Sequence, residues 1–302
     1  MKNISVVITT YNRRKKVLAT IQSVLASENL QNILELMVID DASTDGTSES
    51  LKSSFSSELL KVIRCKQEQL VSKCRNIGLR EARGQFILFL DDDVIVSPKA
   101  ISQLCTFLSQ NVNVACVMPM ILHYNRPDLI WCAGIRHNFW TTHGVFFGYN
   151  EVDNGQFKSP INSDSVITMF MVRKSIATKI WFDSKTFPIG WEDMDFAMKM
   201  KKAGYSVYVL PWVKAWHDFP NARFVKNKLR LYFEVRNRII FHKRWSTNIL
   251  QYFCSVTFSL ATGLIYLFLS IFYLRKFIMP VKTVFTALGD GLLSRYHNPS
   301  DI

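Results

Sequence analysis

The residues best suited to chemistry in this sequence are two clusters of carboxylates. The first cluster, residues 91–93 (DDD), directly follows the apolar run 86–90. Three adjacent carboxylates at the end of a strand repel one another, and a hard divalent cation relieves that repulsion through oxygen ligands. Mg²⁺ commonly shares a few carboxylates with substrate phosphates. An exposed acidic turn is the alternative, and the triplet alone favours neither interpretation.

The second cluster, residues 191–195 (WEDMD), lies at the predicted start of a helix over 193–203. The helix dipole and the free N–H groups of the first turn favour an ionised carboxylate there. One carboxylate can cap the helix while another serves as a general base, although simple capping is also possible. His217, within 215–218 (AWHD), is more often a structural residue than a ligand unless acidic neighbours accompany it.

The elements around these clusters alternate between strands and helices. Short apolar runs predict strands, and helical spacing of apolar residues predicts helices between them. The strands are expected at 4–9, 34–39, 61–64 and 86–90, and the helices at 17–25, 48–55 and 71–82. This order predicts a doubly wound, parallel sheet, whose ligands bind beyond the carboxyl ends of the strands. Polar residues occupy those ends at 10–12, 40–41 and 91–93.

The second half of the soluble region has a weaker pattern. It predicts helices at 99–109 and 193–203, and strands at 114–118, 167–172 and 205–210, the last ended by Pro211. The aromatic-rich and glycine-rich stretch up to about residue 160 has no clear periodicity. Such a stretch suits irregular strands close to a substrate.

A membrane element is expected near the C-terminus. Residues 249–274 contain no charged side chain over 26 positions. As a helix they extend about 39 Å, enough to cross a hydrocarbon core of about 30 Å. Basic residues flank them at 242–244 and 275–276. We expect a transmembrane helix rather than a buried core helix.

The segments on either side of this helix are also informative. Residues 221–245 carry eight Lys or Arg and one acid, which predicts attraction to an anionic leaflet, with a solvated helix face as the alternative. The apolar segment 277–295 is expected to form an interfacial helix or a re-entrant element.

Composition limits the classes of protein. The chain has 302 residues and a formal net charge of +13, which favours nucleic acid, acidic lipid or a phosphorylated substrate as partner. Its mean hydropathy of +0.07 fits a soluble body with a small membrane part. The six cysteines form no CxxC pair, so we expect buried free thiols in a reducing compartment. Neither GxGxxG nor a P-loop motif is present, and no cleavable signal peptide is expected.

Several segments between residues 3 and 245 together resemble the family 2 glycosyltransferases of GT-A fold. They are residues 6–13 (VVITTYNR), 38–47 (VIDDASTDGT), 74–78 (CRNIG), 89–93 (FLDDD), 187–195 (FPIGWEDMD) and 216–217 (WH). Residues 232–237 (YFEVRN) resemble a segment of the rhamnosyltransferase-like branch. Processive members carry QxxRW, whereas residues 241–245 are FHKRW. The resemblance therefore implies transfer of a single sugar rather than polymer synthesis.

The resemblance implies a fold and a division of the chain. The expected fold is α/β, a mixed, mainly parallel GT-A sheet flanked by helices, with a C-terminal membrane helix. The expected parts are a catalytic domain over 1–220 (nucleotide-binding half 1–96, acceptor half 97–220), a basic juxtamembrane helical segment 221–248, a transmembrane helix 249–274, and an amphipathic or re-entrant tail 275–302.

The resemblance also implies roles for individual residues. The expected nucleotide-sugar-binding residues are Thr9, Tyr11, Asp41, Arg75 and Asp92; the metal ligands are Asp91, Asp93 and His217; the acceptor residues are Trp191 and Glu192; and the catalytic base is Asp193. Tyr11 would lie against the nucleobase, and Asp41 would accept a hydrogen bond from a pyrimidine ring N–H. Asp193 is preferred to Asp195 as the base because of its position in the motif.

The implied activity is inverting, metal-dependent sugar transfer with Mg²⁺ or Mn²⁺. The donor would be a nucleotide-diphospho-sugar and the acceptor a lipid-linked or cell-envelope glycan. The protein would be attached to the cell membrane, single-pass or monotopic, with a cytoplasmic catalytic domain.

Two other functions compete with this one. A sugar nucleotidyltransferase normally has a Gly-rich, Arg-containing loop where this chain has residues 10–13 (TYNR). A catalytically inactive, membrane-tethered binding protein would lack the acidic clusters. Nucleic-acid binding is disfavoured because the positive charge gathers beside the predicted membrane helix.

Overall fold

The computed structural model describes residues 3–55, 58–218, 228–274 and 278–297. The chain forms two compact units. We call the first the sheet unit; it comprises residues 1–136, 146–182 and 196–219. The second, the helical unit, comprises residues 137–145, 183–195 and 220–302. The helical unit thus contains two segments from the middle of the chain as well as the C-terminal helices.

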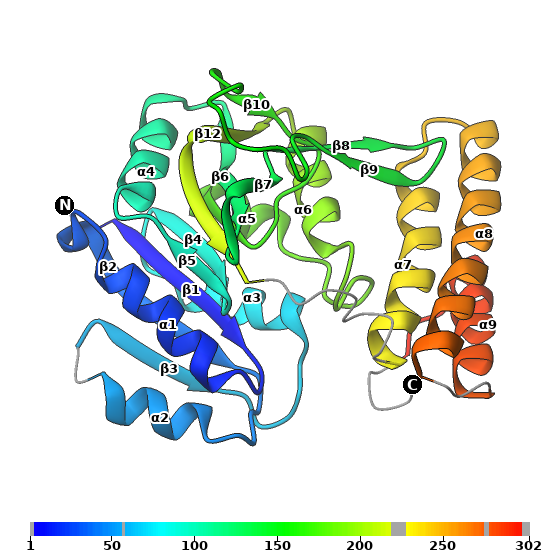
Figure 1. Ribbon diagram of the computed structural model, residues 1–302, viewed down its shortest axis with the longest axis horizontal. Helices are drawn as coiled ribbons and strands as arrows, with labels where there is room; N and C mark the ends of the chain where they lie inside the picture. The colour runs from blue at the N-terminus through cyan, green and yellow to red at the C-terminus, as the bar shows by residue number, and fades with distance from the viewer. Residues whose placement is uncertain (1–2, 56–57, 219–227, 275–277, 298–302) are drawn as a thin grey trace. The chain divides into compact units, whose positions relative to one another are not determined.

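The main sheet has ten strands, and its N-terminal half is parallel (Figure 1). Strand β1 (Ile4–Thr10) pairs in parallel with β2 (Ile33–Asp40) and β4 (Phe86–Asp91), and β2 with β3 (Leu60–Arg64). The remaining strands are β5 (Val94–Val96), β6 (Val114–His123), β7 (Arg126–Cys132), β10 (Ile161–Asn162), β11 (Met169–Arg173) and β12 (Ser206–His217). Strand β11 joins the halves because it is antiparallel to both β4 and β6. The expected mixed, mainly parallel sheet is confirmed.

The other elements are helices and one hairpin. Strands β8 (Ile135–Asn138) and β9 (His143–Phe146) form a separate two-stranded sheet. The remaining helices before the C-terminal region are α1 (Arg14–Leu25), the 3₁₀ turn Leu30–Asn32, α2 (Thr47–Ser54), α3 (Val71–Glu81), α4 (Ala100–Gln110), α5 (Lys174–Ile180) and α6 (Glu192–Lys202). Helix α3 packs on β1 and β2, and α4 packs on β6, β11 and β12.

The central strands are buried because their sequences are continuous apolar runs. Strand β4 reads FILFLD, and its first five residues are buried. Such runs are typical of parallel strands that are covered on both faces. The register places Thr10 opposite Asp40 and Thr9 opposite Asp91. The polar carboxyl ends of β1, β2 and β4 therefore meet at one edge of the sheet, as the sequence predicts.

Strand β12 differs from the expectation that Pro211 ends it. The strand continues to His217, and its pairing with β6 shifts register between Leu210 and Lys214. Proline donates no N–H, and it is tolerated where a bulge interrupts the ladder. The extension matters because it brings His217 opposite Val94, next to the acidic triplet.

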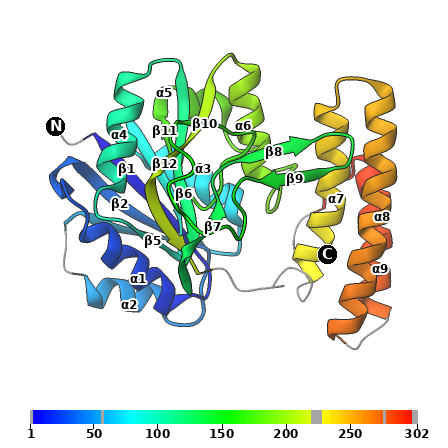
Figure 2. The same ribbon diagram turned by 45° about the horizontal axis from the view of Figure 1, so that its top comes forward.

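The C-terminal helices pack together within the helical unit. Helix α7 (Lys228–Trp245) contacts α8 (Ile249–Leu274) and α9 (Ile278–Leu293), and α8 also contacts α9 (Figures 1 and 2). Helix α8 has the predicted bounds. Its residues Ile249–Leu269 could cross a membrane by length and composition, which is weak evidence for a span.

The basic segment before α8 has exposed and buried members. Lys228, Arg230 and Lys243 are exposed, so the expected attraction of this segment to an anionic leaflet stays a prediction. Arg236 and Arg238 are 1% and 6% exposed, so they lie neither on a solvated helix face nor on a membrane-facing surface. They are buried because they hydrogen-bond to main-chain carbonyls of the helical unit. The expected basic residues Arg223, Lys226, Arg275 and Lys276 lie outside the described residues.

The cysteines agree only in part with expectation. All six are free, as predicted. Cys74, Cys116 and Cys132 are buried, but the other three are only partly buried.

Close packing of α3 on β1 yields a test of the fold. A Cβ on Gly78 would lie 2.2 Å from Val7 Cγ1. We expect Gly78→Ala to lower stability by roughly 1–3 kcal/mol, since a packed core accommodates an added methyl only by shifting. Thermal unfolding should show a midpoint lower by about 2–4 °C per kcal/mol. Gly289→Ala in α9 is the control, because a Cβ there has no neighbour within 4 Å. An unchanged midpoint for Gly78→Ala would contradict this packing.

Candidate functional site

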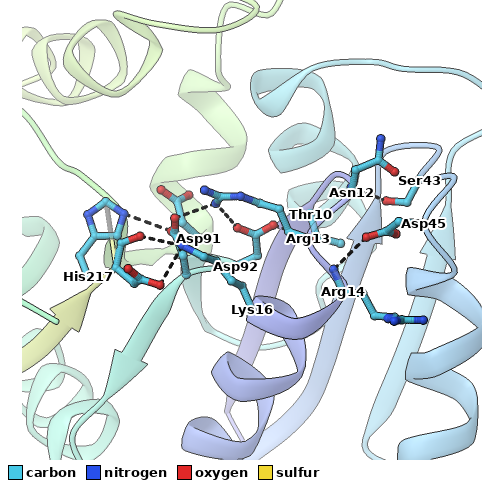
Figure 3. A network of polar contacts seen from close by, with 12 residues as sticks. Thr10, Asn12, Arg13, Arg14, Lys16, Ser43, Asp45, Asp91, Asp92 and His217 are labelled. Atoms are coloured by element: carbon cyan, nitrogen blue, oxygen red, sulfur yellow. Dashed lines mark hydrogen bonds and ion pairs between the residues drawn. The ribbon is translucent and has the colours of Figure 1, made fainter. Parts of the chain in front are cut away.

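Three potential metal ligands meet at the carboxyl edge of the sheet. Asp91 ends β4, Asp93 lies in the turn to β5, and His217 ends β12. One ligand atom from each residue lies within 4.8 Å of the others. Figure 3 shows Asp91 and His217 close together, with Arg13 reaching Asp92 from the loop after β1. Two carboxylates and an imidazole at this spacing could hold a divalent cation.

We call Asp91, Asp92, Asp93 and His217 the acidic centre. Two of its carboxylates contact Arg13, and one of them also contacts His217. Arg13 Nη1 lies 2.5 Å from Asp92 Oδ1 and 2.7 Å from Asp93 Oδ2, and His217 Nε2 lies 3.1 Å from Asp93 Oδ1. Burial works to raise the pKa of Asp93, but the hydrogen bond from His217 and the charges of His217 and Arg13 lower it to about 2. Burial raises the pKa of Asp92 to about 6 despite the charge of Arg13.

Arg13 lies within the motif segment 6–13, but the sequence assigned it no role at this site. Its guanidinium bridges Asp92 and Asp93, which lie 79 and 80 residues away in the chain. Thr10 supports the same centre by donating its hydroxyl to Asp92 Oδ2 at 2.7 Å. One feature of the sequence could have indicated Arg13. It lies just beyond the end of a predicted strand, and that end is expected to meet two other polar strand ends.

The loops after β1 and β2 are joined into one surface by Asn12. Its backbone N–H donates to Ser43 Oγ at 2.9 Å (Figure 3). Its Oδ1 accepts from the N–H of Thr44 at 2.7 Å. Tyr11, on this loop, is 43% exposed. An exposed aromatic ring beside Asp41 provides the kind of surface on which a nucleobase can stack.

Asp41 also fixes the start of α3. Its carboxylate accepts hydrogen bonds from the backbone N–H groups of Gln69 at 2.6 Å and Leu70 at 2.9 Å. The pKa of Asp41 is raised, because the effect of burial outweighs the lowering effect of these hydrogen bonds. Leu70 has a φ of 65°, which is rare for a large side chain, so the carboxylate stabilises an unusual turn.

Arg75 lies on α3 and is turned toward the acidic centre. It is 3% exposed, and its Nη2 lies 3.0 Å from Asp91 Oδ1. Its guanidinium is 5.6 Å from the ring centres of Phe170 and Phe182. The two rings hold the Arg75 guanidinium, which in turn orients Asp91. Thr9, the other expected nucleotide-binding residue, is partly buried at the end of β1.

The second acidic cluster belongs to the helical unit. Glu192 is 7% exposed, and Trp191 and Asp193 are partly buried. Asp195 is 1% exposed, and its Oδ1 accepts from Arg244 Nη1 at 2.8 Å and from Trp245 Nε1 at 3.0 Å. The sequence comparison singled out 241–245 only for its departure from QxxRW. The structure shows that its last two residues hold Asp195.

Helix α7 also holds the backbone in front of this cluster. Gly190 and Trp191 both have positive φ, at 74° and 71°. Asn237 Nδ2 donates to the carbonyls of Ile189 at 3.0 Å and Gly190 at 2.9 Å. Arg236 Nη1 donates to the carbonyl of Thr186 at 2.7 Å. A positive φ at tryptophan costs free energy, so these hydrogen bonds maintain the turn that presents residues 191–193.

A histidine pair within the same unit requires that His242 be neutral. His242 Nδ1 donates to the Arg238 carbonyl at 2.6 Å, which leaves Nε2 to accept from His137 Nε2 at 2.9 Å. Burial lowers the pKa of His242 to about 4. Protonation of His242 would place two N–H groups face to face.

The stability of the helical unit should therefore fall in acid. The pKa of His242 is about 4 in the folded protein and 6.5 as a model value, so the unfolded chain binds a proton first. As pH falls from 6.5 to 4, we expect a loss of up to about 3 kcal/mol from this residue. Thermal unfolding between pH 7 and 4 measures the loss. His242→Asn keeps a donor for the carbonyl but does not titrate, so its pH dependence should be shallower. An identical slope would contradict the assignment.

Comparisons with known proteins identify the family of the chain. Residues 5–181 match the family model described as Glycosyl transferase family 2. An uncharacterized glycosyltransferase of Haemophilus influenzae is 29% identical over 111 residues, which cover 37% of this chain and 36% of that protein. The poly(ribitol-phosphate) beta-N-acetylglucosaminyltransferase TarP of Staphylococcus aureus is 27% identical over 213 residues, covering 68% of this chain and 60% of TarP. The chain thus spans about a third of the length of the Haemophilus influenzae protein and about three fifths of the length of TarP.

A solved structure shares the fold. The crystal structure of GalNAc-T7 with UDP, GalNAc and Mn²⁺ matches with a TM-score of 0.66 and 19% sequence identity. The match covers 80% of this chain and 48% of that one. At this identity the likeness shows the fold, which is the GT-A fold expected from the sequence.

Proposed function

The chain belongs to glycosyl transferase family 2, and we propose that it transfers a single sugar from a nucleotide-diphospho-sugar to a lipid-linked or cell-envelope glycan. The observation that carries the proposal is the meeting of Asp91, Asp93 and His217 at the sheet edge, beside the joined loops that bear Tyr11 and Asp41. The three ligands offer a place for a metal-bound diphosphate, and the joined loops offer a place for the nucleobase. The reaction inverts the anomeric carbon.

We propose Mg²⁺ or Mn²⁺ as the cofactor. Asp91, Asp93 and His217 would hold the cation, and the low pKa of Asp93 keeps that carboxylate ionised at neutral pH. When bound, the cation stabilises the negative charge that develops on the leaving diphosphate. Arg13 adds a second positive charge at the same place. GalNAc-T7, with the same fold, was crystallised with UDP and Mn²⁺.

The nucleotide is assigned to the surface formed by the loops after β1 and β2. Tyr11 stacks on the nucleobase, and Thr9 lines its pocket. An ionised carboxylate has about four acceptor positions, so Asp41 can accept a pyrimidine N–H besides the two backbone N–H groups that it already binds. Asp92, which Thr10 orients, is assigned to the ribose. Arg75 acts near the diphosphate through Asp91.

Asp193 is the proposed general base. The hydroxyl oxygen of the acceptor attacks the anomeric carbon as Asp193 removes its proton, and the bond to the diphosphate breaks. Trp191 and Glu192 are assigned to the acceptor. The choice of Asp193 over Asp195 is supported by the hydrogen bonds that Asp195 accepts from Arg244 and Trp245. A carboxylate held in this way is suited to positioning its neighbours rather than to taking a proton from the acceptor.

Membrane attachment is proposed through α8. The residues Gln251, Ser255, Ser259 and Thr262 recur every three or four positions, so they share one face of the helix, and all are at most 7% exposed. Large apolar side chains are exposed instead, including Phe253 at 60%, Phe268 at 70% and Phe272 at 70%. A helix that buries its small polar residues and exposes its large apolar ones is suited to a lipid environment.

The contacts of α8 favour a monotopic arrangement over a lone span. Ser255 Oγ donates to the Phe139 carbonyl at 3.0 Å, and Arg238 Nη2 donates to Tyr266 Oη at 3.3 Å. These contacts tie α8 to polar segments of the helical unit at positions 11 residues apart, about 16 Å along the helix. We therefore propose that α8 lies in the membrane interface, with the catalytic part on the cytoplasmic side, where sugar nucleotides are expected.

The site assignment is tested by turnover in isolated membranes. Nucleotide release is measured with Mn²⁺ across UDP-, GDP- and dTDP-sugars. We expect Asp93→Asn and Asp193→Asn each to lower turnover by about 10²–10⁴-fold, the range for loss of an acid–base group or a charge that binds the leaving group. Asp128→Asn, at an exposed carboxylate on β7, is the matched control and should keep full activity. Undiminished turnover in both site variants would refute the assignment.

The membrane proposal is tested by charge on the exposed face of α8. We expect the double variant Phe253→Glu, Phe268→Glu to move from the membrane to the soluble fraction, since burying two carboxylates in lipid is costly. The control is Val112→Glu, because Val112 is 73% exposed after α4. Tags at both termini should be reached by protease from the same side of sealed vesicles. Tags on opposite sides would instead favour a span, and continued sedimentation of the double variant would exclude α8 as the attachment.

A further inference from the structure

Two cysteines and an aspartate form a second ligand cluster in the sheet unit. Cys65 directly follows β3, Cys74 lies on α3, and Asp41 directly follows β2. The Sγ atoms and a carboxylate oxygen all lie within 4.8 Å of one another. The Cys74 thiol is hydrogen-bonded to both Cys65 and Asp41. Apart from this cluster and the acidic centre, no comparable group was found among the described residues.

The geometry of the cluster is close to that of a zinc site. Zn²⁺ binds thiolate sulfur at about 2.3 Å and carboxylate oxygen at about 2.0–2.2 Å in a tetrahedron, so its ligand atoms lie about 3.5–3.8 Å apart. Atoms that already lie within 4.8 Å need only small side-chain rotations to reach that spacing. Two sulfur ligands select a soft cation such as Zn²⁺ over Mg²⁺, which prefers oxygen.

The surroundings prepare these ligands for a cation. The backbone N–H groups of Gln69 and Leu70 orient the Asp41 carboxylate, as partners beyond the ligands do in metal sites. Asp40 and Glu68 lie close enough to Asp41 to add negative potential. Cys65 is only partly buried, so solvent can reach the site and supply a fourth ligand.

We propose that Cys65, Cys74 and Asp41 bind one Zn²⁺ or a similar thiophilic divalent cation, with water as the fourth ligand. Each thiol releases its proton to solvent on binding. Because Asp41 is also assigned to the nucleobase, the bound cation competes with the pyrimidine N–H for the electron density of this carboxylate and so weakens binding of the sugar nucleotide. The competition rests on the proposed function, whereas cation binding does not.

The first experiment measures metal binding without reference to activity. The purified full chain, reduced with a phosphine that does not bind zinc, is titrated with Zn²⁺ and separately with Cd²⁺. We expect one equivalent of Zn²⁺ that is held by the cysteines, in addition to the cation held by Asp91, Asp93 and His217. With Cd²⁺ we expect the ultraviolet charge-transfer absorption of cadmium–thiolate bonds, which reports on the cysteine site alone. Cys65→Ser should lose the part of the absorption that one cadmium–sulfur bond contributes, and it should weaken metal binding at least tenfold. Cys105→Ser is the matched control, because Cys105 is also partly buried and lies on α4.

The outcomes are separable. Equal binding by Cys65→Ser, Cys74→Ser and the unaltered protein would overturn the proposal, and thermal unfolding would show that the variants are folded. Cys65→Ser covers the case in which the buried Cys74→Ser does not fold.

The second experiment measures binding of UDP and GDP with and without one equivalent of Zn²⁺. Weaker nucleotide binding, restored by Cys65→Ser, supports competition. Zinc binding without competition would refute the nucleobase assignment of Asp41 and leave the metal site intact.

Discussion

The crowding of three carboxylates at the end of β4 is the constraint on which this structure depends. Asp91, Asp92 and Asp93 are consecutive, and two of them are at most 6% exposed. Like charges at this spacing oppose folding unless positive charge is supplied. The fold supplies it from two distant elements, through Arg13 after β1 and Arg75 on α3, while His217 at the end of β12 hydrogen-bonds to Asp93. The parallel register of β1 with β4, and the length of β12, serve to deliver these groups.

The same principle applies in the helical unit. Asp195 is buried and is stabilised by Arg244 and Trp245 from the end of α7. Asn237 and Arg236 hold the backbone of the preceding turn. Helix α7 therefore supports residues 183–195, and α8 exposes large apolar side chains. The roles predicted for 221–248 and 249–274 remain proposals.

Local patterns were sufficient to predict the strands and helices of the first 91 residues and the edge at which the polar residues gather, but not the strands between 126 and 162. The runs at β1, β2 and β4 are apolar and β-branched or aromatic, and their polar ends are visible in the sequence. The partners of Asp92 and Asp195 could not be predicted from spacing, because Arg13 and Arg244 lie 79 and 49 residues away. Pro211 misled the strand assignment because a register shift absorbs its missing N–H. The buried state of Arg236 depends on the packing of three helices, which periodicity alone does not reveal.

The central claim is that Asp91, Asp93 and His217 hold a divalent cation that binds the diphosphate of the donor. Calorimetric titration of UDP, GDP and dTDP into the full-length protein, with Mn²⁺ or with a chelator, tests it most directly. The account predicts that at least one nucleotide binds, that chelation weakens this binding at least tenfold, and that His217→Ala removes most of the difference. Equal affinity with Mn²⁺ and with the chelator would contradict it.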